Sequence, residues 1–273
     1  MSVRAAAVAG RFYPADAEEL TAQLRALLVA VPSAVRTKLD GKQLAIPKAI
    51  IAPHAGYAYS GPVAASAYSA LQQVPAGSIE RVVLLGPCHR VPLDGFALAD
   101  ATAFDTPLGV VPVDGGVDDL LRLDCVSVSS AAHKLEHCLE VQLPFLTHVL
   151  ATSFTIVPLV VGETTTEQAR AVLQSVWGGP ETLIVVSSDL SHFHSYDEAH
   201  SLDSETSRAI EELASERIRP EQACGRTVIQ GLLDEARTRG MIASILDVRN
   251  SGDTAGNRQE VVGYGAYMIC ERG

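Results

Sequence analysis

Residues 182–192 read TLIVVSSDLSH, a short run of mostly β-branched apolar residues that ends in polar residues and a histidine. The same plan occurs twice earlier, in KAIIAPH (48–54) and RVVLLGPCH (81–89). Apolar runs of this length are typical of buried strands. Helical stretches alternate with them, such as GPVAASAYSALQQV (61–74) and EQARAVLQSVW (167–177). This alternation predicts an α/β fold, in which a central sheet has helices on both faces.

The segments outside this pattern are expected to add helices, a loop and two strands. Asp16 is placed to cap a helix near the N-terminus, with Glu19 three residues on in a capping-box arrangement. Residues 32–46 are polar, contain proline and glycine, and are expected to form a loop. Helices are expected over residues 197–214 and 220–239. They precede two predicted strands, MIASILDVRN (241–250) and EVVGYGAYMIC (260–270).

The length of 273 residues is compatible with one large α/β domain or two small ones. Hydrophobic residues make up 47% and charged residues 19% of the chain, which is below the ~25% charged share of ordinary domains, so a large core is expected. Strands return after the C-terminal helices, and this return favours one continuous sheet. We therefore predict a single domain over residues 1–273.

The charge and hydropathy of the chain argue against two classes of partner. The net charge is −11, and no cluster of Lys and Arg is longer than two residues, so no nucleic-acid partner is expected. The apolar runs are all shorter than the ~18–20 residues that a membrane span requires, so no membrane partner is expected either.

The five cysteines are odd in number and show no CxxC spacing. Arg11 interrupts the alanine-rich N-terminal piece well short of a signal-peptide core. Both observations favour reduced thiols and a cytoplasmic location.

Three of the predicted strands are followed by a histidine, namely His54, His89 and His192. In open α/β sheets, ligands gather beyond the carboxyl ends of the strands, so these imidazoles could converge at one edge. A single histidine after a strand is more often a hydrogen-bonded turn residue. Three together favour a functional site, and Pro53 and Pro87 would hold the local backbone rigid.

Six segments resemble the successive motifs of the Memo family, in order, and AGRFYPADAEEL (9–20) matches the opening segment of that family. The segments are APHAGYAYSGPVAASAY (52–68), LLGPCHRVPL (84–93), EHCLEVQLPFL (136–146), VPLVVG (157–162), VVSSDLSHF (185–193) and CGRTVIQGLL (224–233). The resemblance covers nearly the whole chain. It implies a central mixed sheet flanked by helices on both faces, similar to the class III (LigB-type) extradiol dioxygenases, which use non-haem iron.

Carried over to this sequence, the resemblance makes His54 and His89 metal ligands and Cys224 the third ligand. It places His192 close by and Asp189 in the same loop. The implied cofactor is one transition metal ion, with iron as the first expectation. A cysteine in place of the carboxylate of the dioxygenases also permits copper or zinc, so ring cleavage does not follow from the resemblance.

Several residues allow more than one interpretation. Without the resemblance, Cys224 would be taken as a small buried residue inside an amphipathic helix. His137 and Glu140 are one helical turn apart and could face the site together, with His137 taking part in catalysis. Alternatively, Glu136 and Glu140 favour the dipole of a helix N-terminus. Tyr57 and Tyr59 could line a substrate pocket or pack the sheet edge.

Three functions remain open at this point. The first is a metal-dependent oxidoreductase in which His192 acts as acid/base and Asp189 orients it. The second is a non-catalytic protein that binds a peptide or small molecule in the same pocket. The third is a nucleophilic enzyme, with Cys224 attacking and His192 as base. The resemblance also implies a functional link to a radical-SAM protein.

Overall fold

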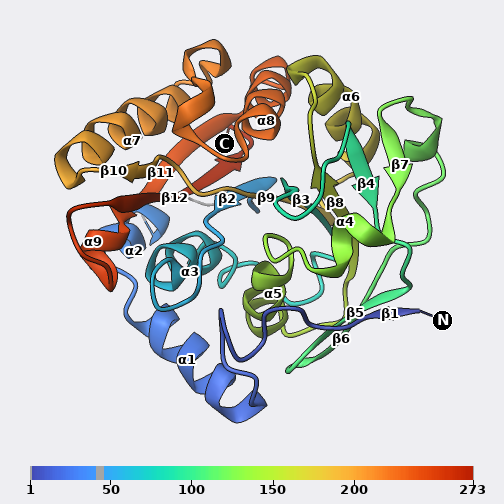
Figure 1. The fold of residues 1–273 in the computed structure, drawn as a ribbon, viewed down its shortest axis with the longest axis horizontal. Helices are drawn as coiled ribbons and strands as arrows, with labels where there is room; N and C mark the ends of the chain where they lie inside the picture. Colours follow the sequence, from blue (N-terminus) through green and yellow to red (C-terminus); the bar gives the residue numbers. More distant parts are fainter. Residues whose placement is uncertain (1, 41–45, 273) are drawn as a thin grey trace.

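The computed structural model describes residues 2–40 and 46–272. Within these residues, the large sheet runs in the order β10-β12-β2-β9-β3-β8-β4-β7, and β11 also pairs with β12 (Figure 1). A small sheet has the order β1-β5-β6. The strands of the large sheet are β2 (Ala49–Ala52), β3 (Arg81–Pro87), β4 (Phe96–Leu98), β7 (Val126–Val128), β8 (Thr155–Val161), β9 (Thr182–Ser187), β10 (His192–His194), β11 (Ile242–Asn250) and β12 (Val261–Cys270). Those of the small sheet are β1 (Val3–Arg4), β5 (Ala103–Thr106) and β6 (Gly109–Pro112).

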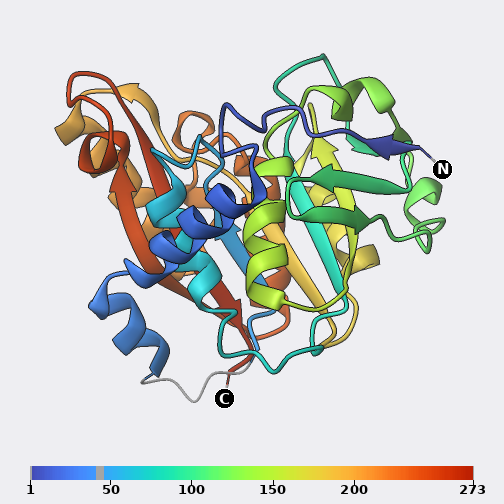
Figure 2. The same ribbon diagram turned by 90° about the horizontal axis from the view of Figure 1, so that it is seen from below.

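The central strands β2, β9, β3 and β8 are parallel to one another, whereas β12 and β4 join them antiparallel. The helices are α1 (Ala17–Val29), α2 (Ser33–Asp40), α3 (Gly61–Ser69), α4 (Ser130–Lys134), α5 (Leu143–Leu150), α6 (Thr166–Val176), α7 (Tyr196–Glu211), α8 (Arg226–Thr238) and α9 (Ser251–Thr254). Helices α6, α7 and α8 cover one face of the sheet, and α1, α3 and α5 cover the other (Figures 1 and 2). The predicted α/β fold with a flanked mixed sheet is therefore confirmed.

Alternate residues of the central strands serve two hydrophobic cores, because successive side chains of a strand point to opposite faces. In β3, Val82 and Leu84 pack with α1, α3 and α5. Val83 and Leu85 pack with α6, α7 and α8. Both faces are apolar, which explains why these strands read as continuous apolar runs in the sequence.

The predicted start of α1 is confirmed, because the Asp16 side chain accepts hydrogen bonds from the N–H groups of Glu18 and Glu19. The loop expected over residues 32–46 is wrong for residues 33–40, which form α2, and residues 41–45 lie outside the described part of the chain. Val35 and Leu39, four residues apart, are 3% and 2% exposed and pack on the core. Tertiary packing thus stabilises a helix whose sequence is mostly polar.

The second C-terminal helix is shorter than predicted. A 3₁₀ turn, η4 (Pro220–Gln222), is followed by an extended residue, and α8 begins only at Arg226. The other predicted C-terminal elements are present as α7, β11 and β12. Among the described residues, no helix is both long and apolar enough to cross a bilayer.

A buried carboxyl group on α7 makes stability depend on pH. Asp203 is 2% exposed, and burial raises its pKa to about 6, although it accepts a hydrogen bond from the Ser191 N–H. The folded state therefore binds this proton more tightly than the unfolded state does. Stability should fall as the pH rises from about 4 through about 6, by as much as ~3 kcal/mol for two pKa units.

We expect Asp203→Asn to remove this loss, because the amide oxygen can still accept the Ser191 N–H without carrying charge. The variant should unfold at higher urea concentration than the wild type at pH 8. Its free energy of unfolding should also fall less than that of the wild type between pH 4 and 6. Urea titrations at pH 4, 5, 6 and 8 measure this. If stability changed equally with pH in both proteins, Asp203 would not be the cause of this pH dependence.

Candidate metal centre

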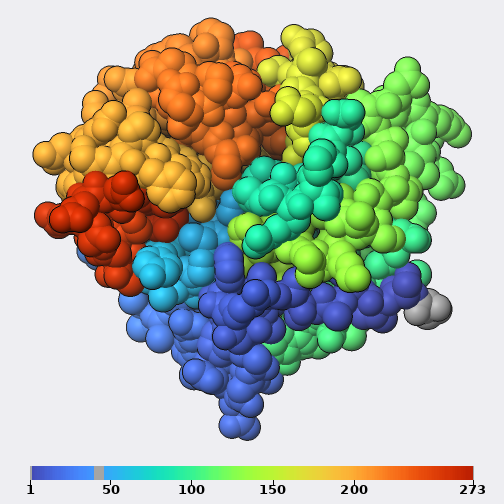
Figure 3. All heavy atoms as spheres, viewed as in Figure 1, coloured from blue at the N-terminus to red at the C-terminus, as the bar shows by residue number. Residues whose placement is uncertain are grey.

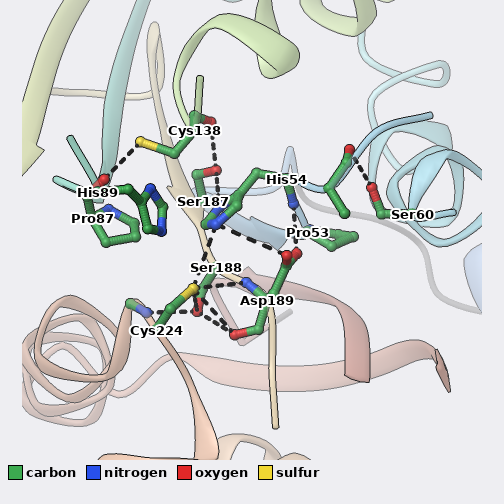
Figure 4. A network of polar contacts seen from close by, with 12 residues as sticks. Pro53, His54, Ser60, Pro87, His89, Cys138, Ser187, Ser188, Asp189 and Cys224 are labelled. Atoms are coloured by element: carbon green, nitrogen blue, oxygen red, sulfur yellow. Dashed lines mark hydrogen bonds and ion pairs between the residues drawn. The ribbon is translucent and has the colours of Figure 1, made fainter. Parts of the chain in front are cut away.

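The candidate site lies at the carboxyl edge of the central parallel strands. His54 follows β2 after one proline, His89 follows β3 after one cysteine, and Asp189 lies two residues beyond β9. Because β2 and β3 both pair in parallel with β9, all three residues emerge at the same edge. Figure 4 shows His54, Asp189 and Cys224 joined by polar contacts, with the ring of His89 close by.

Three imidazoles lie against one another at this edge. The ring centroid of His54 lies 5.2 Å from that of His89 and 5.5 Å from that of His137, and both pairs of rings meet edge to face. His89 and His137 stack at 4.8 Å. One nitrogen from each ring lies within 4.8 Å of the others, so that the group could hold a metal ion. His137 comes from the turn between α4 and η2 (Glu140–Gln142), so three distant segments supply the rings.

His54 is held at both its backbone and its ring. It is 2% exposed, and its N–H donates to Asp189 Oδ1 at 2.7 Å. Its Nδ1 lies 2.9 Å from Ser187 Oγ, which donates its only proton to the Cys138 carbonyl and accepts from Gln142 Nε2. His54 Nδ1 must therefore be the donor, and Nε2 keeps its lone pair. Burial lowers the pKa of His54 to about 4, so the ring is neutral at pH 7.

Cys224 faces the free nitrogen of His54. Its Sγ lies 3.5 Å from His54 Nε2 and accepts the Asp189 N–H at 3.2 Å. Burial, and then the Asp189 carboxylate, raise the pKa of this thiol to about 12. Cys224 lies between η4 and α8 and not inside a helix as predicted. The next residue, Gly225, packs so closely that a Cβ there would meet Ser188 Cβ at 2.8 Å, which explains the glycine.

Glu136 is a buried carboxylate beneath the other two imidazoles. Its Oε2 accepts the His89 N–H at 2.6 Å, and its Oε1 lies 3.0 Å from His89 Nδ1. The N–H groups of His137 and Cys138 also donate to Oε1. Burial alone would raise the pKa of Glu136, but the imidazoles of His137 and His89 beside it hold that pKa well below its usual range.

Glu140 does not share the site with His137. It is fully buried and points toward the N-terminal segment, where its carboxylate accepts from Arg4, from the Tyr13 hydroxyl and from the N–H groups of Ala7 and Val8. The 3₁₀ turn rotates Glu140 away from the imidazoles, so the two acidic residues of EHCLE serve different networks.

His192 begins β10, beyond the same edge of the sheet. Its Nδ1 donates to the Leu190 carbonyl at 2.8 Å. The Asp189 carboxylate, which was expected to orient His192, is instead directed to His54, with Oδ2 4.0 Å from Nε2. Among the described residues, no hydrogen bond or ring contact joins His192 to His54, His89 or Cys224.

The two tyrosines near His54 differ in environment. Tyr57 is 3% exposed, and its hydroxyl donates to the Val141 carbonyl at 2.6 Å, so it packs beneath the edge. Tyr59 is 45% exposed. Figure 3 shows the face to which the edge opens, where cyan, teal, green and orange segments from distant parts of the chain meet near the centre.

The donor set at this edge fits a transition metal. Neutral imidazole nitrogen and cysteine sulfur suit iron, copper and zinc, whereas calcium and magnesium prefer oxygen ligands. Nitrogen and sulfur ligands of a tetrahedral site with bonds of about 2.1 and 2.3 Å lie ~3.6 Å apart. The spacing of 3.5 Å between His54 Nε2 and Cys224 Sγ matches this value.

Sequence reasoning missed the residues that hydrogen-bond to these candidate ligands or to their partners, namely Glu136, Ser187 and Gln142. Glu136 and Ser187 belong to the quoted motifs EHCLE and SSD, and Gln142 lies in EVQLPF. A polar residue beside a candidate ligand is the available signal, but the direction of its side chain depends on contacts between distant segments.

Comparisons with known proteins agree with the resemblance read from the sequence. The family model described as "Memo-like protein" matches residues 4–268. A MEMO1 family protein of Aquifex aeolicus is 37% identical over 275 residues, covering 97% of this chain and 98% of the relative. One of Ignicoccus hospitalis is 36% identical and covers 98% and 99%.

A solved structure is similar in fold. The crystal structure of the uncharacterized protein JW3007 from Escherichia coli K12 superposes with a TM-score of 0.52 at 12% identity. The match covers 81% of this chain and 99% of the other. At this identity the similarity concerns the fold alone.

Proposed function

The chain belongs to the Memo family, and from that premise we propose that it is a metal-dependent oxidoreductase with one transition metal ion at the sheet edge. His54, His89 and Cys224 are the proposed ligands. Iron is the first expectation for the ion, and copper or zinc are the alternatives. The proposed substrate is a small molecule or peptide in the metal pocket, and the functional link to a radical-SAM protein stays a prediction.

The observation that carries this proposal is the convergence of soft and borderline donors. Nitrogen atoms of His54, His89 and His137 lie within 4.8 Å of one another, and Cys224 Sγ lies 3.5 Å from His54 Nε2. These residues come from four distant segments of the chain. The imidazole of His54 is ready to bind a cation, because no proton has to leave its ring first.

The residues around the ligands suit redox chemistry on a bound molecule. When bound, the metal would supply a Lewis-acidic redox centre with open coordination positions. His137 stacks on His89 and is placed to contact a substrate beside the ligands. His192 keeps a free Nε2, because its Nδ1 proton is donated to the Leu190 carbonyl, so it can accept a proton.

The nucleophilic alternative is disfavoured by the thiol. A nucleophilic cysteine needs a lowered pKa, whereas burial raises the pKa of Cys224 to about 12. A metal ion would replace the proton, and the raised pKa then does not prevent thiolate coordination.

The test is elemental analysis of protein purified without oxygen, followed by oxygen consumption with ascorbate as the reductant. We expect close to one iron or copper ion per chain and metal-dependent transfer of electrons from ascorbate to dioxygen. A bound zinc ion, which has no redox chemistry, would instead favour the binding-protein alternative. A stoichiometric metal without oxygen consumption would favour the binding-protein alternative. Protein that contains no transition metal and takes up none would contradict the metal site itself.

His192→Ala should keep its metal and lose most of the oxygen consumption. General acid/base residues contribute ~10²–10⁴-fold to rate, and His192 makes no described contact with the proposed ligands. Metal content and turnover, measured on the same sample, separate the two effects. If His192→Ala loses its metal, His192 is a ligand and the proposed roles are wrong.

A further inference from the structure

Glu136 is the one acidic side chain, among the described residues, whose carboxylate touches two of the three clustered imidazoles. It is 2% exposed and sits in the turn after α4. The backbone around it is fixed independently, because its carbonyl accepts a hydrogen bond from Arg4 Nη2. The carboxylate is held in place by three backbone N–H groups, those of His89, His137 and Cys138.

The carboxylate dictates where the proton of His89 sits. A carboxylate oxygen only accepts hydrogen bonds, and Oε1 lies 3.0 Å from His89 Nδ1, so Nδ1 must carry the proton. Oε2 also accepts the His89 N–H at 2.6 Å, which fixes the backbone of the same residue. In the neutral ring, the lone pair of His89 is therefore on Nε2.

The same oxygen faces His137. Oε1 lies 3.0 Å from His137 Nδ1, and it accepts the His137 N–H at 2.8 Å. The ring contact falls short of hydrogen-bond geometry in angle, and His137 Nδ1 has no other hydrogen-bond partner among the described residues. A proton on Nδ1 is favoured by the negative charge beside it, which again leaves the lone pair on Nε2.

Ser187 produces the same state in His54, whose Nδ1 donates to the hydroxyl. In their neutral forms all three rings therefore favour the Nδ1–H tautomer, and one nitrogen of each ring lies within 4.8 Å of the others. Two separate devices, a carboxylate and a hydroxyl, give this result. This tautomer leaves the Nε2 atoms available as metal ligands.

We propose that Glu136 is the positioning residue of the metal centre, which fixes the tautomer and orientation of His89 and His137 without binding the metal itself. This inference rests on the proposed metal site. The ligand atoms of His89, Glu136 and Cys138 also lie within 4.8 Å of one another, but the oxygens of Glu136 already accept three backbone N–H groups. Partners of this kind typically change metal affinity by ~10–100-fold.

The test uses Glu136→Gln with Glu140→Gln as the matched control. Both carboxylates are buried and lie four residues apart, but Glu140 faces Arg4 and Tyr13 instead of the imidazoles. Apo protein of each variant is titrated with Co²⁺ without oxygen, and the visible absorption of the ion reports binding. Two-bond ¹H–¹⁵N spectra of histidine-labelled apo protein report the tautomer of each ring.

We expect Co²⁺ to bind Glu136→Gln ~10–100-fold more weakly than wild type and to bind Glu140→Gln with unchanged affinity. The spectra should show His89 and His137 as Nδ1–H tautomers in wild type and in Glu140→Gln, and as mixtures in Glu136→Gln. Equal Co²⁺ affinity in Glu136→Gln and wild type would overturn the proposal.

Two further outcomes are also decisive. If wild type binds no Co²⁺, the proposed metal site fails, and the tautomers of the apo variants then decide the role of Glu136 separately. Glu140→Gln leaves the buried charge of Arg4 unpaired, so if either variant does not fold, the wild-type spectrum decides whether the proposed tautomers are present. An Nε2–H tautomer on either His89 or His137 overturns the proposal, and Nδ1–H on both rings supports it.

Discussion

His54→Ala is expected to abolish metal binding while leaving the protein folded. The substitution removes the proposed ligand that links the imidazole cluster to Cys224, whose Sγ lies 3.5 Å from His54 Nε2. The loss of affinity should exceed the ~10–100-fold typical of residues that only orient a ligand. Stability should change little, because Ser187 Oγ keeps its bonds to Cys138 and Gln142 after the ring is removed.

Elemental analysis and thermal unfolding of His54→Ala measure the two parts of this prediction, with His133→Ala as the control. His133 is 3% exposed against 2% for His54, and burial likewise lowers its pKa to about 4. Its Nε2 donates to the Ala97 carbonyl, and it belongs to neither group of metal-capable residues. His133→Ala should lose stability and keep its metal. If the free energy of unfolding of apo His54→Ala were lower than that of wild type by ~2–5 kcal/mol, as after a core Leu→Ala change, the expectation would be contradicted.

Arg4→Met should lower the free energy of unfolding by ~3–5 kcal/mol, the cost of leaving one member of a buried ion pair without its partner. The side chain of Arg4 is 7% exposed, and that of its partner Glu140 is 0% exposed. The guanidinium also donates to the carbonyls of His133 and Glu136, so its removal leaves several buried acceptors unsatisfied.

Urea denaturation of Arg4→Met measures this cost, and two other variants locate its origin. Arg4→Met/Glu140→Gln should recover much of the loss, because the unpaired charge is gone. Arg122→Met breaks an ion pair with Asp119 whose side chains are 80% and 77% exposed, so it should change stability by less than ~1 kcal/mol. If Arg4→Met lowered the free energy of unfolding as little as Arg122→Met does, the carboxylate of Glu140 would not be left buried and uncompensated.

The sequence predicted the parts of this molecule that depend on local pattern. Strands β2, β3 and β9 and the convergence of His54 with His89 follow from short apolar runs that end in the same manner. The predicted roles of His54, His89, Cys224, His192 and Asp189 stay proposals, as does the single domain over residues 1–273.

The parts that could not be predicted depend on contacts between distant segments. Residues 33–40 are helical because Val35 and Leu39 pack on the core, not because of their intrinsic helix propensity. The helix expected to contain Cys224 begins later, because the Asp189 carbonyl accepts the Cys224 N–H and Ser188 Oγ accepts the Gly225 N–H. No local pattern in the sequence predicts these long-range hydrogen bonds.

The position of β12 in the sheet sets the order in which the molecule can be completed during synthesis. This strand, residues 261–270, lies between β2 on one side and β10 and β11 on the other. A ribosome adds ~5–20 residues per second, so β12, the antiparallel neighbour of β2, is made many seconds after β2. β12 pairs with residues 49–51 of β2, so this side of β2 has no neighbour until β12 has been made. A nascent chain stalled before β12 should present β2 as an open edge of the sheet, which could pair with a strand of another chain.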